Sequence, residues 1–238
     1  MFAAAEPNLG NSAGLPAGAF RAGHAPKRDL LVLEVPEAKD YQLVYDLDLA
    51  KLGPTIVYET DNQATIKQPF DRIAYFLELR AADGHSDYLY VSADAFTDQL
   101  ALIGVPTFKS GARFQQNLAR LNVVSNVKGV ITGTGLAGGN LEFWPNNYGP
   151  DNSANVPNAS GQVWDFGDAP AEPPEGYGSM QIHNHDARQT LFAINNWRAG
   201  AGADLGIGNQ PKGNPDWTFA ANAGAYDFKR LRVLVRCK

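Results

Sequence analysis

The fold is decided by residues 41–49, which read YQLVYDLDL. Apolar side chains recur at every second position of this stretch, and Gln42, Asp46 and Asp48 fall between them together with Val44. Because a β-strand turns successive side chains to opposite faces, this period of two predicts a half-buried strand. The side chains expected to share its buried face are Tyr41, Leu43, Tyr45, Leu47 and Leu49.

Short runs of the same kind recur along the chain, each bounded by Gly, Asn, Asp or Pro. Many short strands separated by turn residues are typical of a β-sandwich or barrel. We therefore predict an all-β fold, a jelly-roll-like antiparallel β-sandwich with long ordered loops. The further strands are expected over residues 30–35, 73–79, 88–91, 121–132, 140–144, 163–166, 179–183, 190–195 and 230–236.

Signals for helices and for domain boundaries are few. Residues 92–102 and 114–121 each permit a short helix, but equally a loop or a strand. Residues 1–28 are rich in Ala, Gly, Pro and Asn without any period, which predicts a flexible or wrapping N-terminal segment. No shift in composition divides the rest of the chain, so residues 29–238 are expected to form a single β-sandwich domain.

The composition excludes several classes of protein. The 238 residues contain 20 Lys and Arg against 25 Asp and Glu, a net charge of −5, whereas a nucleic-acid-binding protein needs a basic surface. A hydrophobic fraction of 44% with a charged fraction of 19% is too apolar for a disordered chain. The single cysteine, Cys237, cannot form an internal disulfide, and no run approaches the roughly eighteen apolar residues of a membrane span.

Two patterns have simple structural interpretations. Residues 133–138, GTGLAG, match a dinucleotide-binding motif, but the strand-like residues 140–144 follow where that motif requires a helix. We therefore predict a glycine hairpin or bulge here. The basic residues of the C-terminal strand are interpreted as outward charges that protect a sheet edge from aggregation. They are Lys229, Arg230, Arg232, Arg236 and Lys238.

A histidine pair is the first candidate site. On a strand, His183 and His185 point to the same face, roughly 7 Å apart. Two imidazoles placed in this way can bind a transition metal or act as an acid and base near neutral pH. The alternative is a pair of partly exposed histidines that hydrogen-bond to loop backbone. The candidates for a third metal ligand are His85, Asp165 and Asp168.

A cluster of oxygen-bearing side chains is the second candidate site. Asp165 and Asp168 lie three residues apart, with further Asp and Asn residues upstream over 151–155. Calcium takes six to eight oxygen ligands from carboxylates and carbonyls, so these two aspartates are the candidate ligands of a calcium ion. The alternative is that the Asp and Asn side chains cap turns through bonds to the backbone.

Aromatic residues beside Gly, Asn and Pro form the third candidate site. A flat aromatic face packs well against a sugar ring, and neighbouring amides and carboxylates bind its hydroxyl groups. The alternative is that several of these residues anchor the core, and we expect at least half of them to be buried. The candidate ligand-binding residues are Trp144, Tyr148, Trp164, Tyr177 and Trp197.

Five stretches together resemble a known but uncharacterised family. They are residues 70–79 (FDRIAYFLEL), 140–145 (NLEFWP), 165–168 (DFGD), 176–181 (GYGSMQ) and 204–210 (DLGIGNQ). The chain resembles a β-rich module of large secreted bacterial proteins, often labelled sialate O-acetylesterase or found beside carbohydrate-active domains. The resemblance implies a secreted, cell-surface or periplasmic companion module joined to other domains of a larger protein. It carries no catalytic residue, because the Gly-Asp-Ser block and Asp-x-x-His of that esterase class are absent.

Three functions follow from these observations. The first is a non-catalytic carbohydrate-binding module whose partner is a polysaccharide or other glycan. The second is a glycan-active enzyme, and the third is a structural or adhesion module without a small ligand. Aromatic, amide-rich loops and a low charge favour the first.

The enzyme alternative has two forms. A polysaccharide lyase needs a group that neutralises the uronate carboxylate and a base for the adjacent proton. Arg188 is the candidate neutraliser, and the candidate proton carriers are His183, His185 and Tyr177. A glycoside hydrolase needs two carboxylates at a defined separation, for which Glu142 and Asp165 are the candidates.

Overall fold

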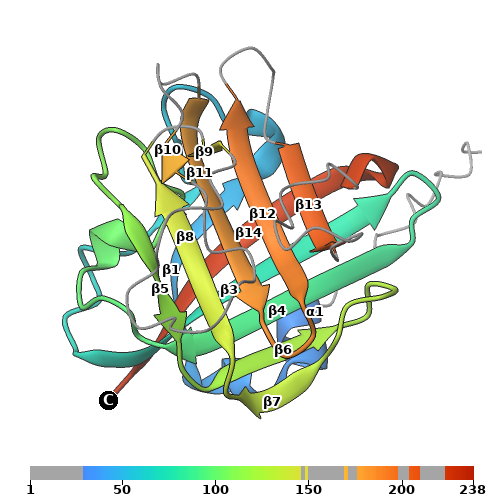
Figure 1. Ribbon diagram of the computed structural model, residues 1–238, viewed down its shortest axis with the longest axis horizontal. Coiled ribbons are helices and arrows are strands. Elements are labelled where there is room, and N and C mark those ends of the chain that lie inside the picture. The colour runs from blue at the N-terminus through green and yellow to red at the C-terminus, as the bar shows by residue number, and fades with distance from the viewer. Residues whose placement is uncertain (1–28, 146–147, 150–168, 171–175, 198–203, 210–222) are drawn as a thin grey trace, which may run out of the picture.

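The protein is an all-β sandwich of two antiparallel sheets, as the sequence predicts (Figure 1). The structure, a computed structural model, describes residues 29–145, 148–149, 169–170, 176–197, 204–209 and 223–238. Of the described helices, none has both the length and the apolar character needed to cross a membrane. The jelly-roll connectivity and the single-domain boundary stay predictions.

The larger sheet has seven strands in the order β2-β1-β14-β3-β4-β6-β7. Their bounds are β1 Gln42–Asp48, β2 Thr60–Asp61, β3 Phe70–Ala81, β4 Ser86–Asp94, β6 Leu121–Ser125, β7 Gly133–Leu136 and β14 Tyr226–Cys237. The smaller sheet has five strands in the order β13-β12-β11-β8-β5. Their bounds are β5 Phe114–Leu118, β8 Gly139–Trp144, β11 Gly176–Asn184, β12 Gln189–Trp197 and β13 Asp204–Asn209.

The remaining elements are short. β9 (Tyr148–Gly149) and β10 (Ala169–Pro170) pair with each other. The helical elements are α1 (Leu30–Glu34) and the 3-10 helices η1 (Pro36–Asp40), η2 (Leu49–Lys51), η3 (Leu100–Leu102) and η4 (Ala223–Ala225).

The main core lies between the two sheets. Tyr75 of β3 reaches across it, with its ring centroid 6.2 Å from that of Phe143 on β8 and 5.8 Å from that of Phe192 on β12. The same hydrophobic cluster takes residues from both sheets. The period of two in residues 73–79 therefore buries one side of β3 in the sandwich, as expected.

The outer face of the larger sheet is covered by the N-terminal helices. Leu31 and Val35 pack in a second hydrophobic cluster with Phe76 of β3 and Leu234 of β14. The prediction of a strand over 30–35 is thus wrong, and α1 forms instead. A short apolar run is compatible with either structure. Here the Asp29 side chain accepts a hydrogen bond from Leu31 N as a helix cap, and the helical spacing of Leu31 and Val35 points both toward the sheet.

Because of a β-bulge in β1, the apolar residues of the stretch 41–49 pack in two different hydrophobic clusters. The register of β1 against β14 shifts between Leu43 and Tyr45, so Val44 is an extra residue in the strand. Tyr41 packs in the outer cluster, whereas Tyr45, Leu47 and Leu49 pack in the main core. The expectation that all five apolar residues share one face is therefore wrong, because an inserted residue reverses the alternation.

Residues 92–102 and 114–121, each permitted a short helix by the sequence, are mostly not helical. Residues 92–94 end β4, and only the 3-10 helix η3 follows within the first stretch. The second stretch contains β5, which pairs with β8 at the edge of the smaller sheet. In both places strand pairing decides the structure over the weak local preference for a helix.

The glycine-rich residues 133–138 contain the bulge that was one of the two predicted forms, since the register of β7 against β6 shifts by one extra residue, but they do not close a hairpin. β7 pairs with β6 in the larger sheet, while β8 pairs with β11 and β5 in the smaller one, so the glycines lie where the chain crosses between sheets. The crossing is tight. A Cβ on Gly138 would meet the side chain of Asp186, and one on Gly139 would meet the carbonyl oxygen of His183.

The basic strand β14 lies inside the larger sheet, between β1 and β3, and not at an edge. The prediction of an edge-protecting role is therefore wrong. Its arginines instead form ion pairs with carboxylates of neighbouring segments. These pairs join β14 to the strands on either side of it and to the residue before α1. The pairs are Arg230 with Asp46, Arg232 with Glu78 and Asp29, and Arg236 with Asp71.

Candidate functional site

The aromatic candidates gather at one end of the smaller sheet. Trp144 ends β8, Tyr177 lies at the start of β11, and Trp197 ends β12. The register confirms that these positions are close, because Gly176 lies opposite Trp197 and Ser179 lies opposite Trp144. This aromatic end, defined by Trp144, Tyr177 and Trp197, is uppermost in Figure 1, where β9 also lies.

The aromatic candidates differ in what they offer to a ligand. Trp144 is buried, with the guanidinium carbon of Arg113 5.1 Å from its ring centroid, so its ring packs within the protein. Tyr177 is half-buried. Tyr148 and Trp197 are described as strand residues only, and Trp164 lies outside the described residues.

Two loops reach the same end and form a pocket, one before β2 of the larger sheet and one between β4 of the larger sheet and β5 of the smaller. Asn196 Nδ2 of β12 donates a hydrogen bond of 2.8 Å to Gly53 O, which places the loop 53–58 there. The loop 104–111 lies there as well, since the carbonyl of Pro106 packs directly on Gly178 of β11. The pocket between them has a volume of about 270 Å³, and we call it the end pocket. Its main lining residues are Tyr45, Ile56, Tyr58, Val105, Thr107 and Lys109.

Two stacked tyrosines form the floor of the end pocket. The rings of Tyr45 and Tyr58 lie 4.2 Å apart at 24°. Tyr45 Oη donates to Leu100 O at 2.8 Å, and Tyr58 Oη accepts from Val105 N at 3.1 Å. Burial raises the pKa of Tyr45 to about 12 and also raises the pKa of Tyr58, so both hydroxyls keep their protons at neutral pH.

A rigid turn forms one rim of the end pocket. Thr107 N donates to Ser110 Oγ at 2.8 Å, and Ser110 N donates to Thr107 Oγ1 at 3.1 Å. Between them, Phe108 is 60% exposed, and Val57 on the opposite loop is 73% exposed. Neither side chain lines the pocket, but each stands between two residues that do, and exposed apolar side chains beside a pocket are typical of a ligand-binding surface.

The histidines lie at the opposite end of β11 from Tyr177. Six residues of extended strand separate Tyr177 from His183, which corresponds to about 20 Å. Arg188 follows in the turn from β11 to β12, where it is exposed and has a φ of 50°. The structure therefore brings the two histidines and Arg188 to one end of the sheet and places Tyr177 at the other.

The two histidines occupy one face, as predicted, but their surroundings differ from the alternative that the sequence offered. His183 lies opposite Asn140 on β8, and His185 Nε2 lies 2.6 Å from Asn140 Oδ1. His183 Nδ1 lies 3.1 Å from Thr190 Oγ1 of β12. Both histidines are buried. The expectation of partly exposed histidines is thus wrong, while their bonding to loop backbone stays a prediction.

Burial controls the charge of the histidine pair. It holds the pKa of His183 well below the usual value, with the neighbouring His185 lowering it further. Burial also lowers the pKa of His185 to about 4, against the opposing effect of Asp186. Both imidazoles are therefore neutral at pH 7.

We expect this pair to make the protein less stable in mild acid. In the unfolded chain a histidine has a pKa near 6.5, so between that pH and about 4 the unfolded state binds protons that the folded state does not. The free energy of unfolding should fall by about 2 kcal/mol or more as the pH drops through this range. Urea denaturation at a series of pH values measures the free energy of unfolding.

The controls for this experiment are two single variants. His185→Gln keeps a side chain that can bond to Asn140 and should flatten the pH dependence. His85→Gln should leave it unchanged, because His85 is largely exposed on the β3–β4 turn, where it contacts Asp87. An equal slope in the wild type and in His185→Gln would contradict the prediction.

The predicted metal sites are not assembled by the residues described. Over these ranges of the chain, no three His, Cys, Asp or Glu side chains gather as metal ligands. His85 belongs to the other sheet and pairs with Asp87. Asp165 and Asp168 lie outside the described residues, so the calcium site stays a prediction.

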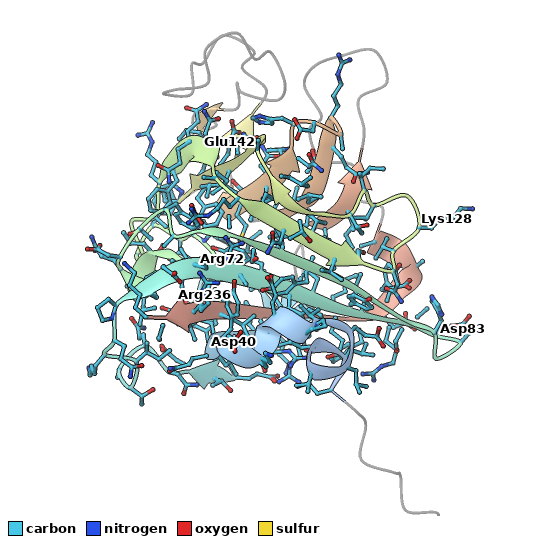
Figure 2. The ribbon with its side chains drawn as sticks, turned by 90° about the horizontal axis from the view of Figure 1, so that it is seen from below. Asp40, Arg72, Asp83, Lys128, Glu142 and Arg236 are labelled. Atoms are coloured by element: carbon cyan, nitrogen blue, oxygen red, sulfur yellow. The ribbon has the colours of Figure 1, made fainter. Side chains whose placement is uncertain are left out.

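Glu142 lies between the two ends of the smaller sheet and is fully buried (Figure 2). Gln181 Nε2 on β11 donates to Glu142 Oε2 at 3.1 Å, and Gln115 Nε2 on β5 donates to Oε1 at 3.4 Å. Its proposed partner in hydrolysis, Asp165, lies outside the described residues. The surrounding amides hold the Glu142 carboxylate in place as part of a polar layer across the sheet.

The sequence pointed to the aromatic end but not to the residues of the end pocket. The lining residues Tyr58 and Lys109, and Phe108 beside Lys109, lie in loops without a motif. The one available signal was an apolar aromatic, Phe108, in a loop among Gly, Pro, Thr and Ser. The sequence around Phe108 does not indicate which other loop lies beside residues 104–111.

Comparison with known proteins adds no relative. The chain matches no family model and has no significant match among curated proteins or solved structures. The resemblance to a module of secreted bacterial proteins therefore stays a prediction. The function is therefore inferred from the geometry of the site.

Proposed function

We propose that this protein is a non-catalytic carbohydrate-binding domain of a secreted bacterial protein and that the sugar binds at the end pocket. One observation carries the proposal. The aromatic strand ends of the smaller sheet and the pocket formed by loops 53–58 and 104–111 lie at the same end of the sandwich. Ligand sites are often built in this way, from loops that a rigid scaffold positions.

The side chains around the pocket suit a sugar. The ring of Phe108, which stands between the lining residues Thr107 and Lys109, is exposed and offers an apolar face to a sugar ring, and Tyr45 and Tyr58 make part of the pocket lining aromatic. Hydroxyl and amide groups of Thr55, Tyr58 and Gln63 line the pocket and match the hydroxyl groups of a sugar. Both features are needed, because stacking provides affinity and hydrogen bonds provide selectivity.

Binding is preferred to catalysis because Tyr177 lies far from the other candidate catalytic residues and the histidines near Arg188 are weak bases. A lyase site needs its neutraliser and its base around one reacting carbon. Tyr177 lies about 20 Å along β11 from His183. His185, with a pKa of about 4, is a weak base at neutral pH. The end pocket likewise favours a small ligand over a purely structural module.

We expect Phe108→Ala to weaken glycan binding about tenfold, since it removes the stacking surface while the turn around it keeps its hydrogen bonds. Affinity electrophoresis on a polysaccharide panel, followed by calorimetry on the best ligand, measures the effect. Ile131→Ala is the matched control. Ile131 is 45% exposed, and its backbone bonds to Gln189 at the histidine end.

Three outcomes are informative. Weaker binding by Phe108→Ala with unchanged binding by Ile131→Ala supports the proposal. Equal binding by both variants and the wild type moves the sugar away from the end pocket. Failure of the wild type to bind any polysaccharide of the panel refutes a carbohydrate-binding role and favours an adhesion module.

A further inference from the structure

Two hydroxyl groups that line the end pocket, those of Tyr58 and Thr107, each have a proton left to donate. Tyr58 Oη accepts a bond from Val105 N, and the described residues provide no acceptor for its proton. Thr107 Oγ1 likewise accepts from Ser110 N and has a proton to give. Ser110 Oγ is already occupied, since it accepts from Thr107 N and donates to Thr107 O.

The charge of the pocket agrees with this count. Among the described residues that line it, Lys109 is the only charged one, and it has no ion-pair partner among them. The carboxylate of Asp61 does not line the pocket, and the backbone and side-chain amides of Gln63 engage it, although its charge contributes to the raised pKa of Tyr45 and Tyr58. The pocket thus presents an ammonium group and two hydroxyl protons, and its ligand should supply the negative charge and the acceptors.

The turn that carries Lys109 is held in a fixed conformation. The reciprocal bonds between Thr107 and Ser110 close it, and Gly111 N donates to Thr107 O at 3.2 Å after it. Gly111 has a φ of 63°, a conformation that glycine adopts without strain. A fixed turn reduces the entropy lost when a charged group pairs with a ligand.

We propose that the end pocket binds a carboxylate-bearing sugar, a uronic acid of a polysaccharide, with its carboxylate paired to Lys109 Nζ and bonded by Tyr58 and Thr107. This proposal rests on the proposed carbohydrate-binding function and specifies its ligand class. Phe108 precedes Lys109 on the same turn and is exposed, so in this proposal the sugar ring packs on Phe108 while the carboxylate pairs with Lys109.

The test compares polygalacturonate with its methyl-esterified form, which keeps the hydroxyl groups and loses the charge, and adds alginate as a second uronate polymer. Calorimetry with the full chain should give about tenfold tighter binding of the acid than of the ester. Lys109→Gln should remove that difference. The matched control is Lys128→Gln, which makes the same change of net charge at an exposed lysine in the β6–β7 connection (Figure 2).

The outcomes separate this inference from the proposed function. Preference for the acid that is lost in Lys109→Gln and kept in Lys128→Gln supports it, and the affinity should then fall with added salt. Equal binding of acid and ester, or of neutral polysaccharides alone, overturns it while leaving carbohydrate binding in place. An equal loss in both lysine variants also overturns it, because only the net charge would then matter. Absence of binding to every polymer refutes both.

Discussion

Replacing Arg72 with methionine is expected to lower the free energy of unfolding by about 3–5 kcal/mol. Arg72 lies on β3 and is 4% exposed, within the larger sheet (Figure 2). It donates to Asp94 Oδ1 at 3.1 Å and Ser92 Oγ at 2.7 Å, both on β4. Methionine fills a similar volume but leaves the buried Ser92 hydroxyl without this donor, while the partly exposed Asp94 keeps its bonds from Arg120.

The same guanidinium also joins segments far apart in the chain. It donates to Tyr41 Oη at 3.0 Å, just before β1, and to Arg120 O at 2.9 Å, between β5 and β6. Ser92 in turn donates to Glu37 of η1 at 2.8 Å. Loss of Arg72 should therefore loosen the N-terminal helices as well as the sheet, since the network connects them.

Arg120→Gln is the matched control, because Arg120 bonds to the same Asp94 carboxylate from the surface. Its side chain is 70% exposed, and an exposed ion pair contributes about 1 kcal/mol or less. Guanidinium denaturation followed by tryptophan fluorescence measures both variants. A similar small loss in the two variants would show that the buried network contributes little.

Gly178→Ala is expected to destabilise the protein by about 3 kcal/mol and to disrupt the end pocket. A Cβ at this position would overlap the carbonyl oxygen of Pro106, and backbone atoms cannot move aside as a flexible side chain would. Relief requires the loop 104–111 to leave β11. Because Val105, Thr107 and Lys109 of that loop line the pocket, glycan binding should fall together with stability.

Gly53→Ala provides the control on the opposite loop. A Cβ at Gly53 meets nothing within 4 Å, so this variant should change stability by about 0.5 kcal/mol or less. Thermal unfolding gives the stability of each variant. Should Gly178→Ala fail to fold, proteolysis of freshly expressed protein at low temperature tests whether cleavage begins in loop 104–111. Stability equal to that of the wild type contradicts the close approach of this loop to β11.

Parts of the candidate site were predictable from single stretches of sequence. The period of two in β11 predicted that His183 and His185 share a face, and they do. The aromatic residues were predicted as a set, and the strand register brings the described positions to one end. Both inferences needed only the local geometry of a strand.

Other parts depended on contacts between distant segments. Trp144 is buried with Arg113 packed on its ring, and the sequence contains no sign of that. The neutral state of the histidines also depends on their burial in the folded protein. The same holds for β14, whose arginines suggested an edge but which lies between β1 and β3.

The sequence by itself determined that this is an all-β protein, because alternation with a period of two has one structural solution that buries the apolar side. It did not determine which loops meet. The end pocket joins residues near 55 with residues near 107, and Asn196 fixes one loop through a bond to Gly53. Only the tertiary structure decided this, since pairing of strands distant in sequence sets where each loop emerges.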